Sequence, residues 1–181
     1  MRGAVFLDRD GTIIRDPGYP GDASLVELLP NAALGLGAMA RAGWPLVIVS
    51  NQSGIARGLY APETFAAINQ RLEELLAPQQ VRFLGTYFCP HLPAISGPCR
   101  CRKPGLELFE RAARDHGLAL DRAWYIGDRS RDVEPAVALR GRGLLVAHPD
   151  READVQRATA LGVTVVGDLL DAATLISAAV R

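Results

Sequence analysis

The sequence predicts an α/β fold, with a doubly wound and mostly parallel β-sheet between layers of helices. Two observations support this prediction. Short runs rich in β-branched and aromatic residues alternate along the chain with stretches of helical patterning. These runs are apolar almost throughout, which is typical of strands covered on both faces in a parallel sheet. The regular alternation of strand and helix favours parallel strands joined by helical crossovers.

Six strands and six helices are expected. The predicted strands span residues 4–8, 45–50, 85–89, 123–128, 143–148 and 163–166. The predicted helices span residues 31–42, 62–77, 105–116, 132–140, 151–161 and 168–179. Pro62 suits a first helical turn, where no amide hydrogen is needed, and Gly43, Gly117 and Gly162 suit helix ends. Residues 90–104 interrupt the alternation with four prolines, and we interpret them as an ordered functional loop.

Length and composition indicate one globular domain over residues 1–181. Apolar residues make up 49% of the chain and charged residues 22%, which excludes a disordered protein. The 20 basic and 20 acidic residues give zero net charge, so we expect no nucleic-acid partner. No apolar run is long enough to span a bilayer, and the N-terminus reaches an acidic motif too early for a signal peptide. We therefore expect a cytoplasmic monomer without a membrane partner.

Polar residues follow three of the predicted strands. Asp8 and Asp10 end the first strand, Ser50 begins the segment SNQSG after the second, and Asp128 and Asp132 lie in GDRSRD after the fourth. In an open parallel sheet, ligands bind beyond the carboxyl ends of the strands. Each segment alone can be a turn or a helix cap. Their joint occurrence predicts a single site.

The residue types at these strand ends suit phosphoryl transfer. Carboxylates such as Asp8 and Asp128 are hard oxygen ligands for Mg²⁺, and a carboxylate can also attack phosphorus. Lys103 and Ser50 would stabilise the phosphoryl oxygens. Asp10 would protonate the leaving alcohol and later accept a proton from water. The sequence thus favours a magnesium-dependent enzyme acting on a small phosphate ester.

All three cysteines lie within thirteen positions, in the loop 89–104. Cys89 and His91 form one pair and Cys99 and Cys101 another. Three thiolates and one imidazole make a closed tetrahedral set that suits structural zinc. We expect Zn²⁺ to hold this proline-rich loop and to place Arg102 and Lys103 at the edge of the site.

The segments DRDGT, VSNQSG, CRKP and YIGDRSRD resemble the four motifs of the haloacid dehalogenase superfamily of phosphotransferases. The resemblance implies a Rossmann-like fold, with Asp8 as nucleophile, Asp10 as general acid and base, and Ser50 and Lys103 as phosphoryl stabilisers. It also implies that Asp8, the main-chain carbonyl of Asp10, and Asp128 hold Mg²⁺. Because DRDGT has a second acidic residue, the segment resembles the motif of the phosphatases in this superfamily and not that of the dehalogenases.

The zinc loop resembles a branch of the superfamily that has no large cap domain. That branch contains heptose bisphosphate phosphatases, which remove the 7-phosphate, and histidinol-phosphate phosphatases. The resemblance to the heptose bisphosphate phosphatases implies that Arg102 binds the second phosphate of the substrate. It also implies substrate contacts from the following positions: Asp16, Gly18, Tyr19, Asn51, Gln52, Ser53 and Arg129. These segments favour the heptose bisphosphate.

Three alternatives remain open from the sequence. CPHLPA and IGDR are equally similar to the histidinol-phosphate enzymes, and RKPGLELF is shorter than the heptose pattern. Another small phosphate ester is a further possibility. A catalytically silent scaffold would be expected to lack at least one of Asp8, Asp10, Lys103 and Asp128, and all four are present.

Overall fold

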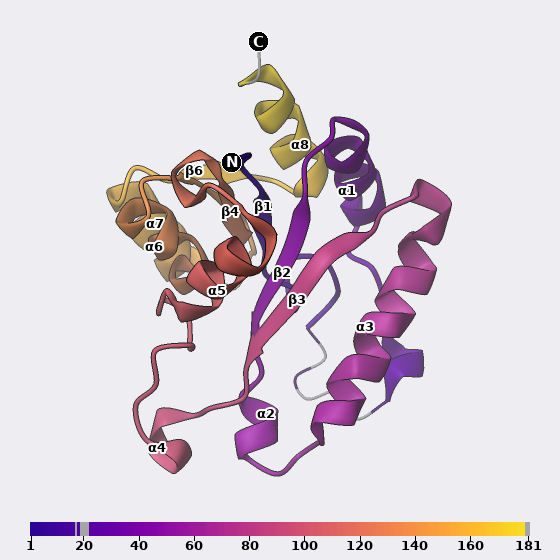
Figure 1. Ribbon diagram of the computed structural model, residues 1–181, viewed down its shortest axis with the longest axis vertical. Coiled ribbons are helices and arrows are strands. Elements are labelled where there is room, and N and C mark those ends of the chain that lie inside the picture. The colour runs from indigo at the N-terminus through magenta and orange to yellow at the C-terminus, as the bar shows by residue number, and fades with distance from the viewer. Residues whose placement is uncertain (17, 19–21, 180–181) are drawn as a thin grey trace.

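The protein is built on one six-stranded parallel sheet (Figure 1), seen in a computed structural model that describes residues 1–16, 18 and 22–179. The strand order is β3-β2-β1-β4-β5-β6, so β1 lies in the middle. The strands are β1 (Val5–Leu7), β2 (Leu46–Asn51), β3 (Phe83–Cys89), β4 (Trp124–Gly127), β5 (Arg142–Val146) and β6 (Thr164–Val166). This is the order of doubly wound folds in which the ligand crevice lies where the winding reverses. The predicted fold class is confirmed.

The helices connect successive strands. They are α1 (Ala32–Arg41), α2 (Ser53–Ala56), α3 (Pro62–Leu76), α4 (Pro93–Ser96), α5 (Glu107–His116), α6 (Ser130–Ala138), α7 (Glu152–Ala160) and α8 (Leu169–Ala178). Single 3-10 turns span Ala23–Leu25, Ala77–Gln79 and Leu120–Arg122. All six predicted helices are present, but the four-residue helices α2 and α4 were not predicted. Helices this short have too little periodicity to be recognised from sequence.

Helix α6 begins two residues earlier than predicted. The side chain of Asp132 accepts a hydrogen bond from the backbone N–H of Arg129 at 3.1 Å, so Asp132 lies inside the first turn. Reaching back to the N-cap residue in this way satisfies an amide that the helix itself leaves unpaired. Asp132, which the sequence suggests as the first residue of this helix, therefore lies in its first turn and stabilises its N-terminus.

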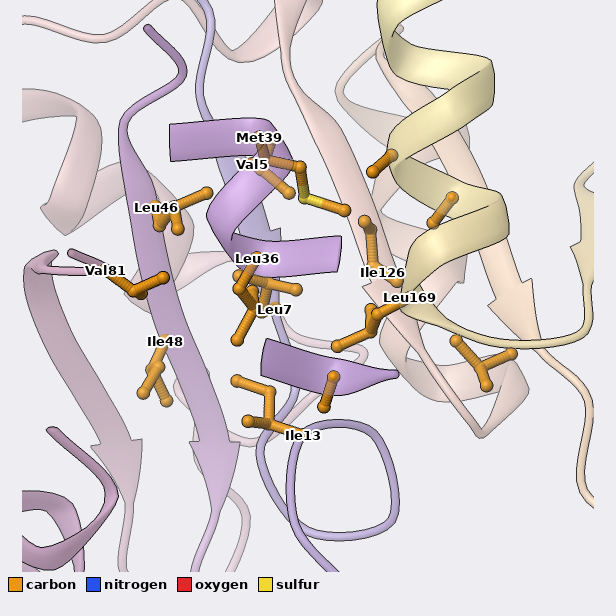
Figure 2. Close-up of a cluster of buried hydrophobic side chains, with 14 of the residues drawn as sticks. Val5, Leu7, Ile13, Leu36, Met39, Leu46, Ile48, Val81, Ile126 and Leu169 are labelled. Carbon is orange, nitrogen blue, oxygen red and sulfur yellow. The ribbon is translucent and has the colours of Figure 1, made fainter. Parts of the chain in front are cut away.

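Alternating side chains of β1 enter two separate cores. Val5 and Leu7 pack with α1, α3 and α8 on one face, where Leu36 of α1 is fully buried (Figure 2). Ala4 and Phe6 face the opposite core, which α5 and α6 cover. Because successive residues of a strand point to opposite faces, both faces need apolar residues. The run AVFL before Asp8 is apolar throughout for this reason.

The register of the sheet brings three strand ends together. Leu7 of β1 pairs with Ile48 of β2 and with Ile126 of β4. The residues that follow these strands therefore leave the sheet at the same edge, at the centre of the fold. The described residues form no separate cap domain after β1 or β2, so this edge is closed only by loops and the short helix α2. Within the described part of the chain, no helix has the length and apolarity to cross a membrane.

Candidate active site

Lys103 lies at the centre of the site, between two carboxylates. Its ammonium group donates a hydrogen bond to Asp8 Oδ1 at 2.6 Å and to the carbonyl oxygen of Val49 at 2.6 Å. It also lies 2.8 Å from Asp132 Oδ1. The side chains of Lys103, Asp8 and Asp132 are 2%, 9% and 2% exposed, so these charges are almost fully removed from water. Buried charges require partners of opposite sign, and this group supplies them internally.

This group combines two carboxyl groups with one ammonium group. Burial raises the pKa of Asp8 to about 7, and the negative charges of Asp132 and Asp10 add to this rise. The positive charge of Lys103 acts in the opposite direction and lowers the pKa of Asp8, but it does not outweigh burial. Burial also works against the charge of Lys103, but Asp132 and Asp8 outweigh it and raise the pKa of Lys103. Lys103 is therefore charged at neutral pH, and Asp8 titrates near neutrality.

Asp128 follows β4 and faces the turn after β1. Thr12 Oγ1 donates a hydrogen bond to Asp128 Oδ1 at 3.2 Å. Gly11 has a φ of +89°, and a Cβ at this position would lie 2.6 Å from Asp128 Oδ2. The glycine in DRDGT is thus needed both for its left-handed backbone and for the close approach of Asp128. Arg151, the residue before α7, forms an ion pair with Asp128 and lies 3.7 Å from Asp16.

A hydrogen-bonded chain fixes the carboxylate of Asp10. Gln52 Nε2 donates to Asp10 Oδ2 at 2.6 Å and to Ser50 Oγ at 2.7 Å. Tyr60 Oη donates to Gln52 Oε1 at 2.5 Å, which determines the orientation of the amide. Arg9 binds Asp10 from the other side, with Nε 2.9 Å from Oδ1. The candidate general acid therefore has a fixed position before any substrate binds.

Arg9 is fully buried, which is unusual for an arginine. Its guanidinium lies 4.6 Å from the ring centroid of Phe65 and donates to Asn69 Oδ1 at 3.0 Å, both on α3. With the bond to Asp10, these contacts compensate the lost hydration of the cation. Arg9 thus connects the turn after β1 to α3.

Asn51 positions Lys103 through the backbone. Asn51 Oδ1 accepts from the N–H of Lys103 at 2.9 Å, and Asn51 Nδ2 donates to the carbonyl of Lys103 at 3.2 Å. The adjacent Lys103–Pro104 peptide bond is cis. The two bonds attach the end of the cysteine-rich loop to the end of β2. Asn51 and Gln52, expected as substrate contacts, thus also hold Lys103 and Asp10 in place.

A cavity of about 240 Å³ opens above these groups. Its lining contains most of the residues expected from the sequence: Asp8, Asp10, Asp16, Gly18, Ser50, Asn51, Gln52, Ser53 and Arg129. Gly54, Tyr60 and Arg131 complete the lining. Arg102 does not line the cavity, and its guanidinium donates to the carbonyl oxygen of His91 at 3.1 Å. Tyr19, also expected to contact substrate, lies outside the described residues.

The four zinc-ligand candidates form a compact cluster. Cys89 Sγ lies 3.7 Å from Cys99 Sγ, 3.8 Å from His91 Nδ1 and 2.9 Å from Cys101 Sγ. His91 Nδ1 is 3.2 Å from Cys101 Sγ. A zinc–sulfur bond of about 2.3 Å implies sulfur–sulfur separations of about 3.8 Å around a tetrahedral ion. The donor set therefore fits Zn²⁺, and the Cys89–Cys99 separation matches this value, whereas the Cys89–Cys101 separation is shorter.

The environment of Cys99 favours its thiolate. Burial works against this charge, but the backbone N–H of Arg102 and the neighbouring Cys101, Cys89 and His91 lower the pKa of Cys99 to about 7. A thiol must lose its proton to bind a metal, so this environment assists metal binding. Arg102 contacts the cluster twice, through its N–H to Cys99 and through its side chain to His91.

Comparisons with known proteins agree with this geometry. Residues 100–172 match the family described as HAD-hydrolase-like. The D-glycero-beta-D-manno-heptose-1,7-bisphosphate 7-phosphatase of Pseudomonas putida is 31% identical over 170 residues, covering 91% of this chain and 94% of that protein. The enzyme of the same name from Mesorhizobium japonicum is 37% identical over 179 residues, covering 93% of this chain and 81% of that protein. The chain belongs to the haloacid dehalogenase-like hydrolase family.

A solved structure of this family has a similar fold along almost the whole chain. The D,D-heptose 1,7-bisphosphate phosphatase from B. bronchiseptica, complexed with magnesium and phosphate, superposes with a TM-score of 0.87 at 27% identity. The alignment covers 97% of this chain and 98% of that one.

The carboxylates of this haloacid dehalogenase-like hydrolase fit a magnesium ion. Oxygen atoms of Asp8, Asp128 and Asp132 all lie within 4.8 Å of one another, and all three residues are buried. All three carboxylates have protein partners: Asp132 binds Lys103 and the N–H of Arg129, Asp8 binds Lys103, and Asp128 binds Thr12 and Arg151. Asp8 and Asp128, at the ends of the adjacent strands β1 and β4, would share a metal with these partners. Two carboxylates with room for water and substrate oxygens are the set that Mg²⁺ prefers.

Several residues of the site had no assigned role from the sequence. Arg131 lies within GDRSRD, so its presence in a motif was the only signal. Tyr60 and Arg151 lie outside every motif, and no local pattern marks them. Arg9 stands between the two aspartates, but its burial depends on α3, which lies far along the chain.

Proposed function

We propose that this protein is a magnesium-dependent phosphatase that removes the 7-phosphate of D-glycero-D-manno-heptose 1,7-bisphosphate through an aspartyl-phosphate intermediate. The observation that best supports the proposal is the contact of Lys103 Nζ with Asp8 Oδ1 at 2.6 Å, below a polar cavity. A carboxylate nucleophile and a phosphate repel each other, and a fixed ammonium group beside the nucleophile reduces this repulsion.

In this mechanism, Asp8 attacks the phosphorus atom and the sugar alkoxide leaves. Asp10, held by Gln52 and Arg9, protonates the alkoxide. Lys103 and the hydroxyl of Ser50 bind the phosphoryl oxygens. A water molecule then attacks the phosphorus atom of the acyl phosphate, Asp10 takes its proton, and Asp8 is released with inorganic phosphate.

Asp8, Asp128 and the main-chain carbonyl of Asp10 would hold Mg²⁺. When bound, the ion neutralises phosphoryl charge during transfer. Cys89, His91, Cys99 and Cys101 would hold Zn²⁺ in a closed structural site. Through the loop, this site supports Lys103, which the two bonds from Asn51 hold on the other side.

The heptose bisphosphate is favoured as substrate because relatives that align with over nine tenths of the chain carry that name. Asp16, Gly18, Asn51, Gln52, Ser53 and Arg129 line the cavity and would contact or support the sugar phosphate. Arg102 would lie at the edge of this cavity, where the zinc loop holds it.

We further propose that residues 1–181 act as one domain and as a monomer in the cytoplasm, on a small molecule and not on nucleic acid or membranes. Zero net charge supports the absence of a nucleic-acid partner. Light scattering at the protein concentrations used in kinetic assays would test whether the protein is a monomer.

The substrate is tested by steady-state kinetics with Mg²⁺ on three compounds: heptose 1,7-bisphosphate, histidinol phosphate and fructose 1,6-bisphosphate. The proposal expects the highest kcat/KM for the heptose, with a 1-phosphate product identified by ³¹P NMR. Asp8→Asn serves as the inactive control. A higher kcat/KM for histidinol phosphate would show that histidinol phosphate is the preferred substrate, and it would leave the proposed phosphatase mechanism unchanged.

A further inference from the structure

Two arginines line the catalytic cavity on the side of α6. Among the described residues, Arg129 and Arg131 are the only basic side chains in its lining. Arg129 is the N-cap of α6 and Arg131 is the second residue of the helix. Both follow Asp128 closely, so they face the cavity from the strand end that carries a metal-ligand candidate.

Two backbone amides beside these arginines already have acceptors. The N–H of Arg129 donates to Asp132 Oδ2 at 3.1 Å, and the N–H of Ser130 donates to Asp154 Oδ1 at 2.8 Å. These two amides therefore have acceptors from the protein, and within the described residues no hydrogen bond or ion pair engages the guanidinium groups of the two arginines, which leaves them available for a ligand.

The side chain of Arg131 lacks a partner within the described chain. Its Nε is buried and has no hydrogen-bond acceptor, and no carboxylate lies within ion-pair distance of its guanidinium. Asp154 is the acidic group nearby. Burial works against its charge, but the N–H of Ser130 and the charges of Arg129 and Arg131 lower the pKa of Asp154. A buried donor without an acceptor is unfavourable, so this arginine is suited to bind an anion from the cavity.

Arg102, the residue expected to hold a second phosphate, lies elsewhere. Its guanidinium donates to the carbonyl of His91, and it does not line the cavity. This contact places its charge against the cysteine loop. The cavity therefore takes its positive charge, apart from the buried Lys103, from α6.

We propose that Arg131, together with Arg129, binds the second phosphate of the substrate, the one that is not attacked by Asp8. Guanidinium groups bind phosphate oxygens in pairs, and two adjacent ones match the double charge of a terminal phosphate. Arg131 is thus a specificity-determining residue that favours bisphosphates over monophosphates. This inference rests on the proposed phosphatase activity at Asp8.

The test compares Arg131→Gln and Arg131→Lys with the unaltered protein, with Mg²⁺, on two substrates: heptose 1,7-bisphosphate and p-nitrophenyl phosphate. Arg131→Gln is expected to lower kcat/KM for the bisphosphate by about ten- to a hundredfold, mainly through KM. Arg131→Lys retains the charge but not the paired contact, so a smaller loss is expected. Activity on p-nitrophenyl phosphate, which has no second phosphate, is expected to stay within about twofold.

Arg114→Gln is the matched control, because it removes the same charge from the exposed last turn of α5. Arg114→Gln is expected to leave kcat/KM unchanged for both substrates. Equal losses on both substrates in Arg131→Gln, or no loss on the bisphosphate, would overturn the assignment of Arg131. An unaltered protein that hydrolyses neither substrate would overturn the phosphatase proposal itself, and this result is visible before any variant is made.

Discussion

The ammonium group of Lys103 lies 2.6 Å from a carboxylate oxygen of Asp8, although 95 residues separate the two in the chain. A lysine from the end of a proline-rich loop thus meets an aspartate from the central strand, and both are buried. Asp132 contacts the same ammonium at 2.8 Å from a third segment.

Replacing Asp8 by asparagine should abolish phosphatase turnover while the fold remains intact. The side chain keeps its shape but loses the charge that attacks phosphorus, so we expect kcat to fall by about a thousandfold or more. Phosphate release and circular dichroism measure the two effects. Asp150→Asn is the control, since that side chain is 90% exposed. Near-normal rates in Asp8→Asn would refute its role as nucleophile.

Replacing Lys103 by methionine should reduce both stability and activity. The change leaves Asp8 and Asp132 buried without a cation, and breaking such a buried group costs about 3–5 kcal/mol. Denaturant unfolding measures the loss. Adding Asp132→Asn should recover part of the stability, because one unpaired charge is removed.

Activity should not recover in that double variant, since the ammonium beside Asp8 is still missing. Recovery of both properties would show that Lys103 serves the fold and not the chemistry.

Magnesium affinity should fall as the pH drops below neutrality. Burial raises the pKa of Asp8 from its ordinary 3.8 to about 7, and only the ionised carboxylate binds the metal. We expect the apparent affinity to fall by up to about tenfold per pH unit below 7 and to level off above about pH 8. Calorimetric titration with Mg²⁺ in buffers of different ionisation enthalpy would also detect the released proton. A flat affinity between pH 5.5 and 8 would contradict this role of Asp8.

The same shift has an opposite consequence for the metal-free protein. Between pH 3.8 and about 7 the folded state binds the Asp8 proton more tightly than the unfolded state. The contribution of Asp8 to the free energy of unfolding therefore falls as the pH rises through this range, and it is lowest above pH 7. Asp8→Asn should remove this part of the pH dependence in urea titrations performed with a chelator.

The cysteine loop should contain one zinc ion per chain. Elemental analysis after metal-replete expression measures it directly. His91→Ala should lose the zinc and raise KM, because the loop no longer places Arg102 and Lys103 correctly. His116→Ala, a histidine outside the cluster, should keep the metal. Absence of zinc from the unaltered protein would remove this role of the loop.

Much of the fold follows from local patterns. The run from Ala4 to Leu7 is apolar throughout because its side chains enter both cores, and this is visible in the sequence. Cys89, His91, Cys99 and Cys101 are close in the chain, so short-range geometry is enough to predict their cluster. Asp8 and Asp10 were placed at a strand end by the same reasoning, since glycine and threonine follow immediately.

Tertiary structure alone decided which charges meet. The strand order places β1 between β2 and β4, and this order makes Asp8, Ser50 and Asp128 neighbours at the edge that the carboxyl ends of all the strands share. Lys103 meets Asp8 and Asp132 from distant segments, and Arg9 meets Phe65 and Asn69 of α3 as well as its neighbour Asp10. Hydrophobic periodicity specifies which face of an element is buried, but the pairing of buried polar groups depends on contacts between elements. For that reason the sequence determined the reactive residues of this protein, and the fold determined their neighbours.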